Sequence, residues 1–146
     1  MIKKILVPLD GSGYSKKALE LACDLADKYE AELYLMHVIL TGESKRTLVL
    51  GGASITVNSS REKIEEAGRK VMEAAEQIAA DRGCKKVHSD VLVGPAAQAI
   101  LEHAKGKNVD MIVMGSRGLS DISGLVVGST SHKVSHLAEC TCVMVH

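Results

Sequence analysis

Three spaced glycines precede a predicted helix, and they indicate a loop that meets a ligand with its main chain. Gly115 and Gly118 follow an apolar run, and Gly128 comes after nine further residues. A ligand can approach the main chain at Gly115 because glycine has no Cβ, and Gly118 and Gly128 can adopt positive φ angles to turn the chain. Loops of α/β proteins are often rich in glycine merely to turn, but three glycines at this spacing are harder to explain in that way.

Hydroxyl groups and one arginine complete this loop. Ser129 and Thr130 follow Gly128 at the predicted start of the helix, and Arg117 lies between the first two glycines. The exposed N–H groups and the dipole of a helix start bind anions, to which the two hydroxyls can add hydrogen bonds and Arg117 a positive charge. The segment therefore predicts a phosphate site. It is not a P-loop, because the pattern G-x4-G-K-[ST] does not occur in the chain.

A second polar loop follows the first apolar run. It runs from Pro8 to Ser12 and contains Asp10, a flexible glycine and a hydroxyl that can cap a helix. A carboxylate beside phosphates repels them unless it binds a ribose hydroxyl or a divalent cation. Asp10 is therefore a candidate for one of these two roles.

Alternating elements must position both loops. Five apolar runs typical of buried parallel strands alternate with four amphipathic segments. The expected strands cover Ile2–Leu9, Glu32–Ile39, Val87–Val93, Val109–Met114 and Thr141–Val145. This order predicts one α/β domain over residues 1–146, an open, mostly parallel, Rossmann-like sheet with helices on both faces and right-handed crossovers. Its ligand site is expected beyond the carboxyl ends of the strands, where the loops after the first and fourth strands meet.

Helical spacing predicts which residues the helices bury. The first helix is expected from Ser12 to Glu30, and a capping box of Ser59 and Glu62 is expected to open the second, which ends at Gly83. Pro95 is expected in the first turn of the third helix. The expected core positions are Ala18, Leu21, Ala22, Leu25 and Tyr29 in the first helix, Ile64, Ala67, Val71, Ala75 and Ile78 in the second, and Val134, Leu137 and Ala138 in the fourth.

Residues 40–58 do not fit the alternation. Two β-favouring runs flank Gly51 and Gly52 within Thr47–Val57, which is compatible with a hairpin that has a two-residue turn. The preferred interpretation is a mobile loop over the carboxyl edge of the sheet. A lid and a surface for a second subunit are the alternatives.

The chain resembles the universal stress protein family along essentially its whole length. The spacing G-x2-G-x9-G-[ST] from Gly115 to Ser129 is similar to the ATP-binding motif of that family. Further similarities are the Pro-x-Asp-Gly-Ser turn from Pro8, the strand ending at His37-Val38 and the short last strand. The resemblance implies a strand order of 3-2-1-4-5 and a regulatory stress-response protein, with ATP or AMP held where the strand order reverses.

The resemblance also implies roles for individual residues. The main chain of Val38 would face the adenine, and Mg²⁺ or Mn²⁺ would accompany the phosphates, with Asp10 as an indirect ligand. The other implied positions are Pro8 and Asp10 at the nucleoside, Met114, Gly115, Arg117 and Gly118 along the cleft, and Gly128, Ser129 and Thr130 at the phosphates.

A homodimer that pairs the last strands is a further implication of the resemblance. The family commonly has proline before its last strand, whereas here Cys142 follows Thr141. This departure weakens the inference about dimer geometry and leaves the ligand site untouched.

Two other functions remain open from the sequence. One is a metal or redox protein that uses four residues near the C-terminus, which could ligate zinc if the last helix continued far enough: His132, His136, Cys140 and Cys142. A nucleotide-hydrolysing enzyme is the other alternative, with Asp10 and Asp121 positioning a water. Against efficient catalysis, the segment Asp10-Gly-Ser-Gly-Tyr-Ser matches the Ser-Gly-Gly-x-Asp-Ser loop of ATP pyrophosphatases poorly, and a nucleophile with a base and an orienting group is not evident.

Composition narrows the classes of partner. The 18 Lys+Arg residues balance 18 Asp+Glu, and the chain has three Tyr but neither Trp nor Phe. Proteins that bind nucleic acids normally have a basic balance or aromatic stacking residues, so this class is disfavoured. The N-terminus lacks the apolar run of a signal peptide, and no stretch approaches the length of a membrane span. We therefore expect a cytoplasmic protein with reduced cysteines.

Overall fold

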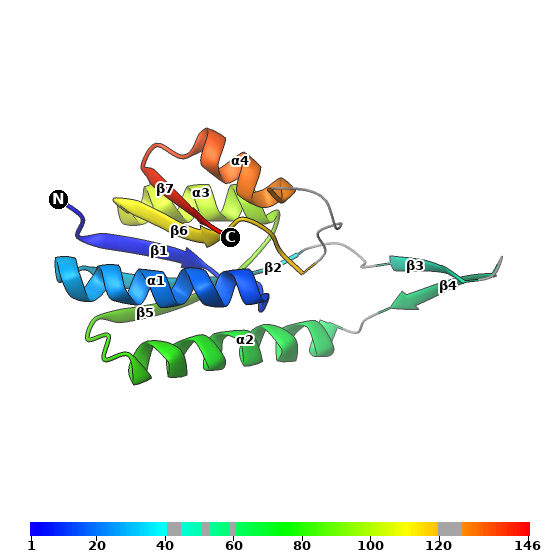
Figure 1. Ribbon diagram of the computed structural model, residues 1–146. Helices are drawn as coiled ribbons and strands as arrows, with labels where there is room; N and C mark the ends of the chain where they lie inside the picture. Colours follow the sequence, from blue (N-terminus) through cyan, green and yellow to red (C-terminus); the bar gives the residue numbers. More distant parts are fainter. Residues whose placement is uncertain (41–44, 51–52, 59–60, 120–126) are drawn as a thin grey trace.

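The computed structural model (Figure 1) describes residues 1–40, 45–50, 53–58, 61–119 and 127–146. Its helices and strands alternate along most of the chain. In chain order they are β1 (Lys4–Pro8), α1 (Gly13–Tyr29), β2 (Glu32–Ile39), β3 (Lys45–Leu50), β4 (Ala53–Asn58), α2 (Arg61–Asp81), β5 (Val87–Val93), α3 (Ala96–Lys107), β6 (Met111–Gly115), α4 (Ser129–Leu137) and β7 (Thr141–Val145).

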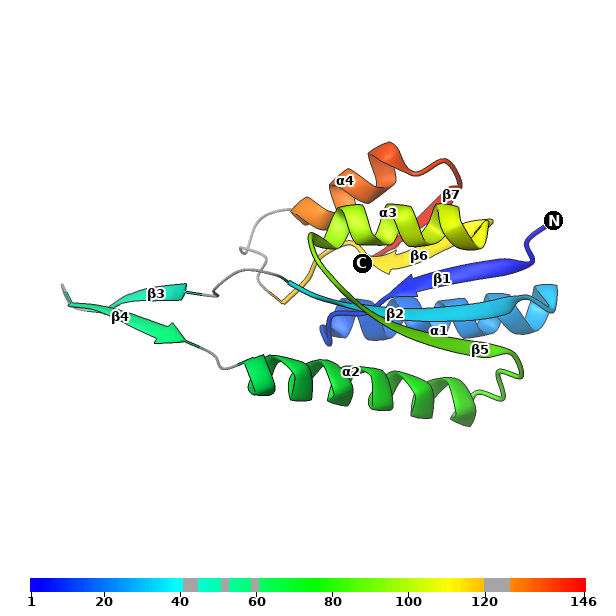
Figure 2. The ribbon, with the colours of Figure 1, turned by 180° about the vertical axis from the view of Figure 1, so that it is seen from behind.

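Five of the strands form one parallel sheet. Its order is β5-β2-β1-β6-β7, which is the predicted order 3-2-1-4-5 once β3 and β4 are set aside. The chain moves from β1 to β2 on one side and later returns to β6 on the other, so the strand order reverses between β1 and β6. The two opposite views show α1 and α2 on one face of the sheet and α3 and α4 on the other (Figures 1 and 2). The predicted α/β fold is confirmed.

The central strands β1 and β6 bury both of their faces, which explains their continuous aliphatic runs, whereas the edge strand β5 is partly exposed. Ile5 and Val7 of β1 pack into the cluster that α1 and α2 cover. Leu6, between them, packs on the other face with residues of α3 and α4. Because side chains alternate along a strand, a strand between two helical layers has no solvent face to mark with polar residues.

Helix α1 keeps its predicted bounds and buries Ala18 and Ala22 as predicted, but its buried face is rotated from the predicted one. Leu21 and Tyr29, predicted as core, are 36% and 41% exposed, whereas Leu19 and Cys23 are almost fully buried. The stripe of alanines beside Leu19 lies against the sheet and turns Leu21 toward solvent. Two more predicted core residues are exposed, Ala67 in α2 and Leu137 in α4.

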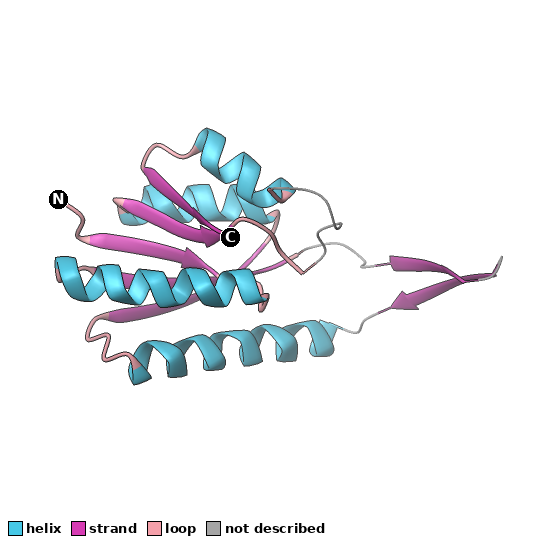
Figure 3. Cartoon of the chain, in the orientation of Figure 1, coloured by secondary structure: helices cyan, strands magenta, loops and turns pink. Residues whose placement is uncertain are grey.

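Residues 45–50 and 53–58 form a hairpin arm between β2 and α2. β3 and β4 pair antiparallel from Lys45↔Asn58 to Leu50↔Ala53. Figure 3 shows the arm extending away from the five-stranded sheet. The hairpin alternative is confirmed for these residues, and the loop interpretation is wrong there. The predicted turn at Gly51 and Gly52 and the predicted cap at Ser59 lie outside the described residues.

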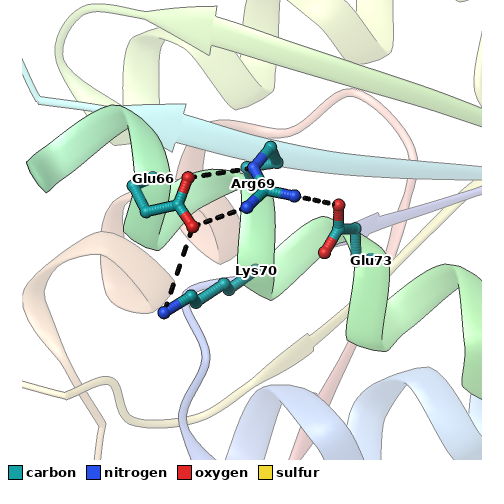
Figure 4. A network of polar contacts seen from close by, with 4 residues as sticks. All are labelled: Glu66, Arg69, Lys70 and Glu73. Carbon is teal, nitrogen blue, oxygen red and sulfur yellow. Dashed lines mark hydrogen bonds and ion pairs between the residues drawn. The ribbon is translucent and has the colours of Figure 1, made fainter. Parts of the chain in front are cut away.

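The outer face of α2 is a network of charges (Figure 4). Glu66 and Lys70, four residues apart, form an ion pair with 4.0 Å between Oε1 and Nζ. Arg69 joins Glu66 to Glu73, and its hydrogen bond holds the pKa of Glu66 below the usual range. These side chains are exposed, so the network adds little to the stability of the helix.

Asp110, the residue before β6, anchors the N-terminal end of the chain. Its Oδ2 accepts hydrogen bonds from the main-chain N–H groups of Lys3 and Lys4 at 2.8 and 3.0 Å. These bonds, that of Lys3 first, lower the pKa of Asp110. The ionised carboxylate therefore stabilises the fold above its unfolded pKa of about 3.9, and this contribution is lost as pH falls through the lower folded value.

We expect Asp110→Asn to lower the free energy of unfolding by about 1 kcal/mol at pH 7. The difference from the native protein should shrink as the pH falls below about 4, where the native carboxylate also becomes protonated. Urea unfolding at pH 7 and pH 3 measures both values. Asp27→Asn, at an exposed position of α1, is the control, and an equal loss in the two variants would contradict the anchoring role.

Candidate functional site

A cavity of about 570 Å³ lies at the carboxyl edge of the sheet, where the strand order reverses. Its volume is within the range of small-molecule sites, roughly 300–1,000 Å³. The structure brings all ten predicted site residues together along its wall. They are Pro8, Asp10, Val38, Met114, Gly115, Arg117, Gly118, Gly128, Ser129 and Thr130.

Asp10 joins the two loops that the sequence singled out. Its Oδ1 accepts from Ser12 N at 2.9 Å, and its Oδ2 accepts from Leu119 N at 3.2 Å. Gly11, between Asp10 and Ser12, has a φ of +85°, which permits the tight turn. Both carboxylate oxygens thus already hold main-chain donors, so Asp10 has a structural task that the sequence did not reveal.

The start of α4 presents main-chain amides that its cap leaves uncovered. Gly128 is the N-cap and has no side chain to accept from the N–H groups of the first turn. Its own N–H donates to Ser116 O at 2.7 Å, and Ser131 Oγ donates to Gly115 O at 2.8 Å, which fixes the helix start against the end of β6. Amides at a helix start that no side chain caps, and whose position is fixed in this way, are suited to an anion.

The glycines act differently from the sequence prediction. Gly128 has φ −71° and ψ 161°, and Gly118 is not among the glycines with positive φ, so the predicted positive φ is wrong at both positions. A Cβ on Gly115 would lie 2.7 Å from Tyr14 Cβ and 2.8 Å from the Tyr14 carbonyl carbon. Gly115 therefore allows α1 to pack closely on β6, because a side chain at this position would point into the helix.

Arg117 brings the main positive charge to the loop after β6. Its guanidinium carbon lies 5.8 Å from the centre of the Tyr14 ring, a cation–π arrangement. Its Nε is buried and has no hydrogen-bond partner among the described residues. A buried donor without a partner is costly, so an acceptor on a bound anion would relieve that cost.

The main chain of Val38 lies beyond the end of β1. β1 pairs with β2 only as far as Pro8 and Met36, and Leu9 N then donates to Met36 O at 2.8 Å. Peptide groups two residues apart point to the same side of a strand, so the N–H and C=O of Val38 also point to the β1 side. They face the cavity edge, where they can bond a planar polar ligand.

Helix α2 supplies a wall that sequence reasoning missed. Ile64, Gly68 and Val71 line the cavity from this helix. A Cβ at Gly68 would lie 2.9 Å from His37 Cδ2, and His37 Nδ1 is 2.7 Å from Leu9 O. Since a carbonyl only accepts, Nδ1 of His37 carries the proton. The glycine in the middle of a predicted helix was the signal that something packs closely there.

Charge in the cavity is sparse and mainly positive. Asp10 is the one acid among the described lining residues, which also include Arg117, Lys63 and His37. The remaining wall is largely aliphatic. A single carboxylate whose oxygens both accept main-chain hydrogen bonds does not form a metal site by itself.

The zinc alternative is wrong for the residues that the structure describes. α4 ends at Leu137, so Cys140 and Cys142 do not continue the helical face of His132 and His136. Both thiols pack against the core under α3 and α4, and burial raises the pKa of Cys142 to about 11. Within the described residues, no group of three or more His, Cys, Asp or Glu side chains could hold a metal ion.

The predicted catalytic partner Asp121 lies outside the described residues. No described helix is both long and apolar enough to cross a membrane.

Comparisons with known proteins agree along the whole chain. The model of the universal stress protein family matches residues 1–146. Universal stress protein YxiE of Bacillus subtilis is 37% identical over 150 aligned positions, which cover 99% of each chain.

Two similar solved structures are complexes with nucleotides. A universal stress protein in complex with cAMP has a TM-score of 0.73 at 21% identity, covering 99% of this chain and 97% of that one. The universal stress protein of Archaeoglobus fulgidus in complex with dAMP has a TM-score of 0.71 at 18% identity, covering 100% and 98%. At these identities the two structures show a shared fold.

Proposed function

Because the chain belongs to the universal stress protein family, we propose that it binds an adenine nucleotide in the cavity at the carboxyl edge of its sheet. The phosphates would lie at the start of α4. The base would lie against the main chain of Val38. The cAMP and dAMP complexes of proteins with the same fold support this class of ligand.

One observation carries the proposal. The cavity combines amides at the start of α4 that no side chain caps with the buried Nε of Arg117, which has no hydrogen-bond partner among the described residues, whereas the rest of its described lining is largely aliphatic. One end therefore suits an anion and the other suits a flat apolar body. With neither Trp nor Phe in the chain, the base would be held by aliphatic packing and main-chain hydrogen bonds.

A divalent cation would arrive with the nucleotide. We propose Mg²⁺ or Mn²⁺, held mainly by the phosphates, because Asp10 is the one acid among the described lining residues. Asp10 would contact the cation indirectly, since both of its oxygens already accept main-chain hydrogen bonds. When bound, the cation would offset part of the phosphate charge. Its direct ligands would come mainly from the phosphates rather than from the protein.

Calorimetry with ATP, ADP and AMP tests the proposal, with and without Mg²⁺. We expect saturable binding of at least one of them, with a preference that reports how many phosphates the loop holds. Mass spectrometry of small molecules that co-purify gives an independent answer. Absence of heat with all three nucleotides under both conditions would contradict the proposal.

We expect Arg117→Ala to weaken ATP binding by about 10- to 100-fold, because a charge-assisted hydrogen bond contributes roughly 1.5–3 kcal/mol. Adenosine, which has no phosphate, should bind the variant and the native protein equally. The two titrations therefore separate the phosphate end from the base. An equal loss for adenosine would show that Arg117 supports the cavity as a whole.

In this proposal the protein is a nucleotide-dependent switch in a stress response rather than an efficient catalyst. Asp10, the one acid among the described lining residues, accepts hydrogen bonds from the Ser12 and Leu119 amides, so its carboxylate is not poised as a general base. Repeated ATP turnover above the level of a variant that cannot bind would contradict this part.

We further propose a cytoplasmic homodimer that pairs through β7. β7 is an edge strand of the sheet, so its outer main-chain groups are available for a second copy. The four free cysteines accord with a reducing compartment. Sedimentation equilibrium measures the assembly, and a monomer at micromolar concentration would contradict the dimer.

A further inference from the structure

Two cysteine thiols from distant parts of the chain meet on the sheet face covered by α1 and α2. Cys23 is in the middle of α1 and only 2% exposed, and Cys84 is half-buried in the turn between α2 and β5. Both belong to the same core cluster, and Cys84 lies near enough to contribute to the raised pKa of Cys23. They are free thiols in this structure.

A salt bridge beside the thiols holds the two segments in register. Arg82 Nη1 lies 2.8 Å from Asp24 Oδ1, and these residues neighbour Cys84 and Cys23 in the sequence. The N–H of Cys84 also donates to Ala79 O at 3.0 Å, which fixes its main chain at the end of α2. The ion pair therefore holds the segment that carries Cys84 against α1, and the main-chain bond fixes the position of Cys84 at the end of α2.

Burial gives the two cysteines different chemical roles. Cys84 is partly accessible, so a small oxidant reaches it first. Burial, followed by the neighbouring Cys84, raises the pKa of Cys23 to about 12, so Cys23 stays protonated at neutral pH and is not the first site of oxidation. When a half-buried cysteine lies beside a fully buried one, the first can be oxidised to a sulfenic acid and the second can condense with it to a disulfide.

We propose that Cys23 and Cys84 form a reversible disulfide when the protein meets hydrogen peroxide. The Cys84 sulfur attacks one peroxide oxygen, the O–O bond breaks, and a sulfenic acid and one water result. The Cys23 sulfur then attacks the Cys84 sulfur, the S–S bond forms, and the hydroxyl leaves with the thiol proton as a second water. Two thiols lose two electrons in total, and the peroxide gains them.

The bond would tie α1 to the turn before β5. That turn lies at the amino edge of the sheet, opposite the cavity, so the inference does not depend on nucleotide binding. Closing a loop of about 60 residues restricts the unfolded chain, and we expect the melting temperature to rise by about 10 °C. Oxidation would thus strengthen the domain rather than damage it.

Peptide mapping of the full chain tests the proposal. The native protein is treated with hydrogen peroxide, alkylated, and digested with trypsin without reduction. We expect the peptide of residues 18–28 to be joined to that of residues 83–85, with two thiols lost and both restored by dithiothreitol. Cys140 and Cys142 lie in another peptide, residues 134–146, so the linkage is unambiguous.

Two variants serve as controls. Cys84→Ser should remove both the linkage and the rise in melting temperature, whereas the double variant Cys140→Ser/Cys142→Ser should keep both. Sulfinic or sulfonic acid on Cys84 beside a free Cys23 would overturn the proposal. So would no loss of thiol, a bond to another cysteine, or a linkage that forms only in urea.

Discussion

Gly128→Val is expected to weaken ATP binding at least 100-fold and to leave the fold and the melting temperature largely unchanged. We expect this result because the phosphates are proposed to lie at the start of α4. The φ of −71° and ψ of 161° at Gly128 are open to any residue, so valine causes no backbone strain. Its isopropyl group would occupy the space in front of the uncapped amides, where a phosphate must approach.

Two further substitutions sharpen this experiment. Gly128→Asp places a carboxylate at the N-cap, where it should stabilise α4 by about 0.5–1 kcal/mol and still abolish ATP binding, because it caps the amides and repels phosphate. Gly106→Val adds the same side chain as Gly128→Val at an exposed position of α3 with nothing within 4 Å, and it should bind ATP normally. Unchanged affinity in a folded Gly128→Asp protein would move the phosphate site away from α4.

Gly115→Ala is expected to have the largest effect on stability, a loss of about 3 kcal/mol in the free energy of unfolding. The new Cβ would lie 2.7 Å from Tyr14 Cβ and 3.0 Å from Ser15 N. Main-chain atoms of α1 cannot rotate away as a flexible side chain can, so the start of α1 must shift from β6. For a chain of this size, the melting temperature should fall by roughly 6–12 °C.

The matched control for Gly115→Ala is Gly106→Ala. Gly106 lies in α3, exposed and with nothing within 4 Å, so alanine there should stabilise the helix by about 0.5–1 kcal/mol. Thermal unfolding of the two variants therefore gives shifts of opposite sign. Because the start of α1 borders the cavity through Ser15, Gly115→Ala should also weaken ATP binding. Equal melting temperatures in the two variants would contradict the packing argument.

The architecture could be predicted from the sequence because it rests on short-range patterns. Continuous aliphatic runs such as Ile5–Val7 mark strands buried on both faces, and alternation with amphipathic segments leaves few topologies. The loop residues could be found for a related reason. In a parallel sheet all strands end at the same edge, so polar loops after the strands beside the reversal must converge, as Asp10 and Gly128 do.

Contacts between distant segments were decided only by the tertiary structure. Nothing local to Gly115 shows that Tyr14 lies against it, and nothing local to Cys23 shows that Cys84 is its neighbour. Two further features depend on how the helices pack on the sheet. One is the wall that α2 adds to the cavity, and the other is which side of α1 is exposed. A periodic pattern determines that a helix has an apolar face, whereas the exact rotation of that face follows from the shapes that it meets.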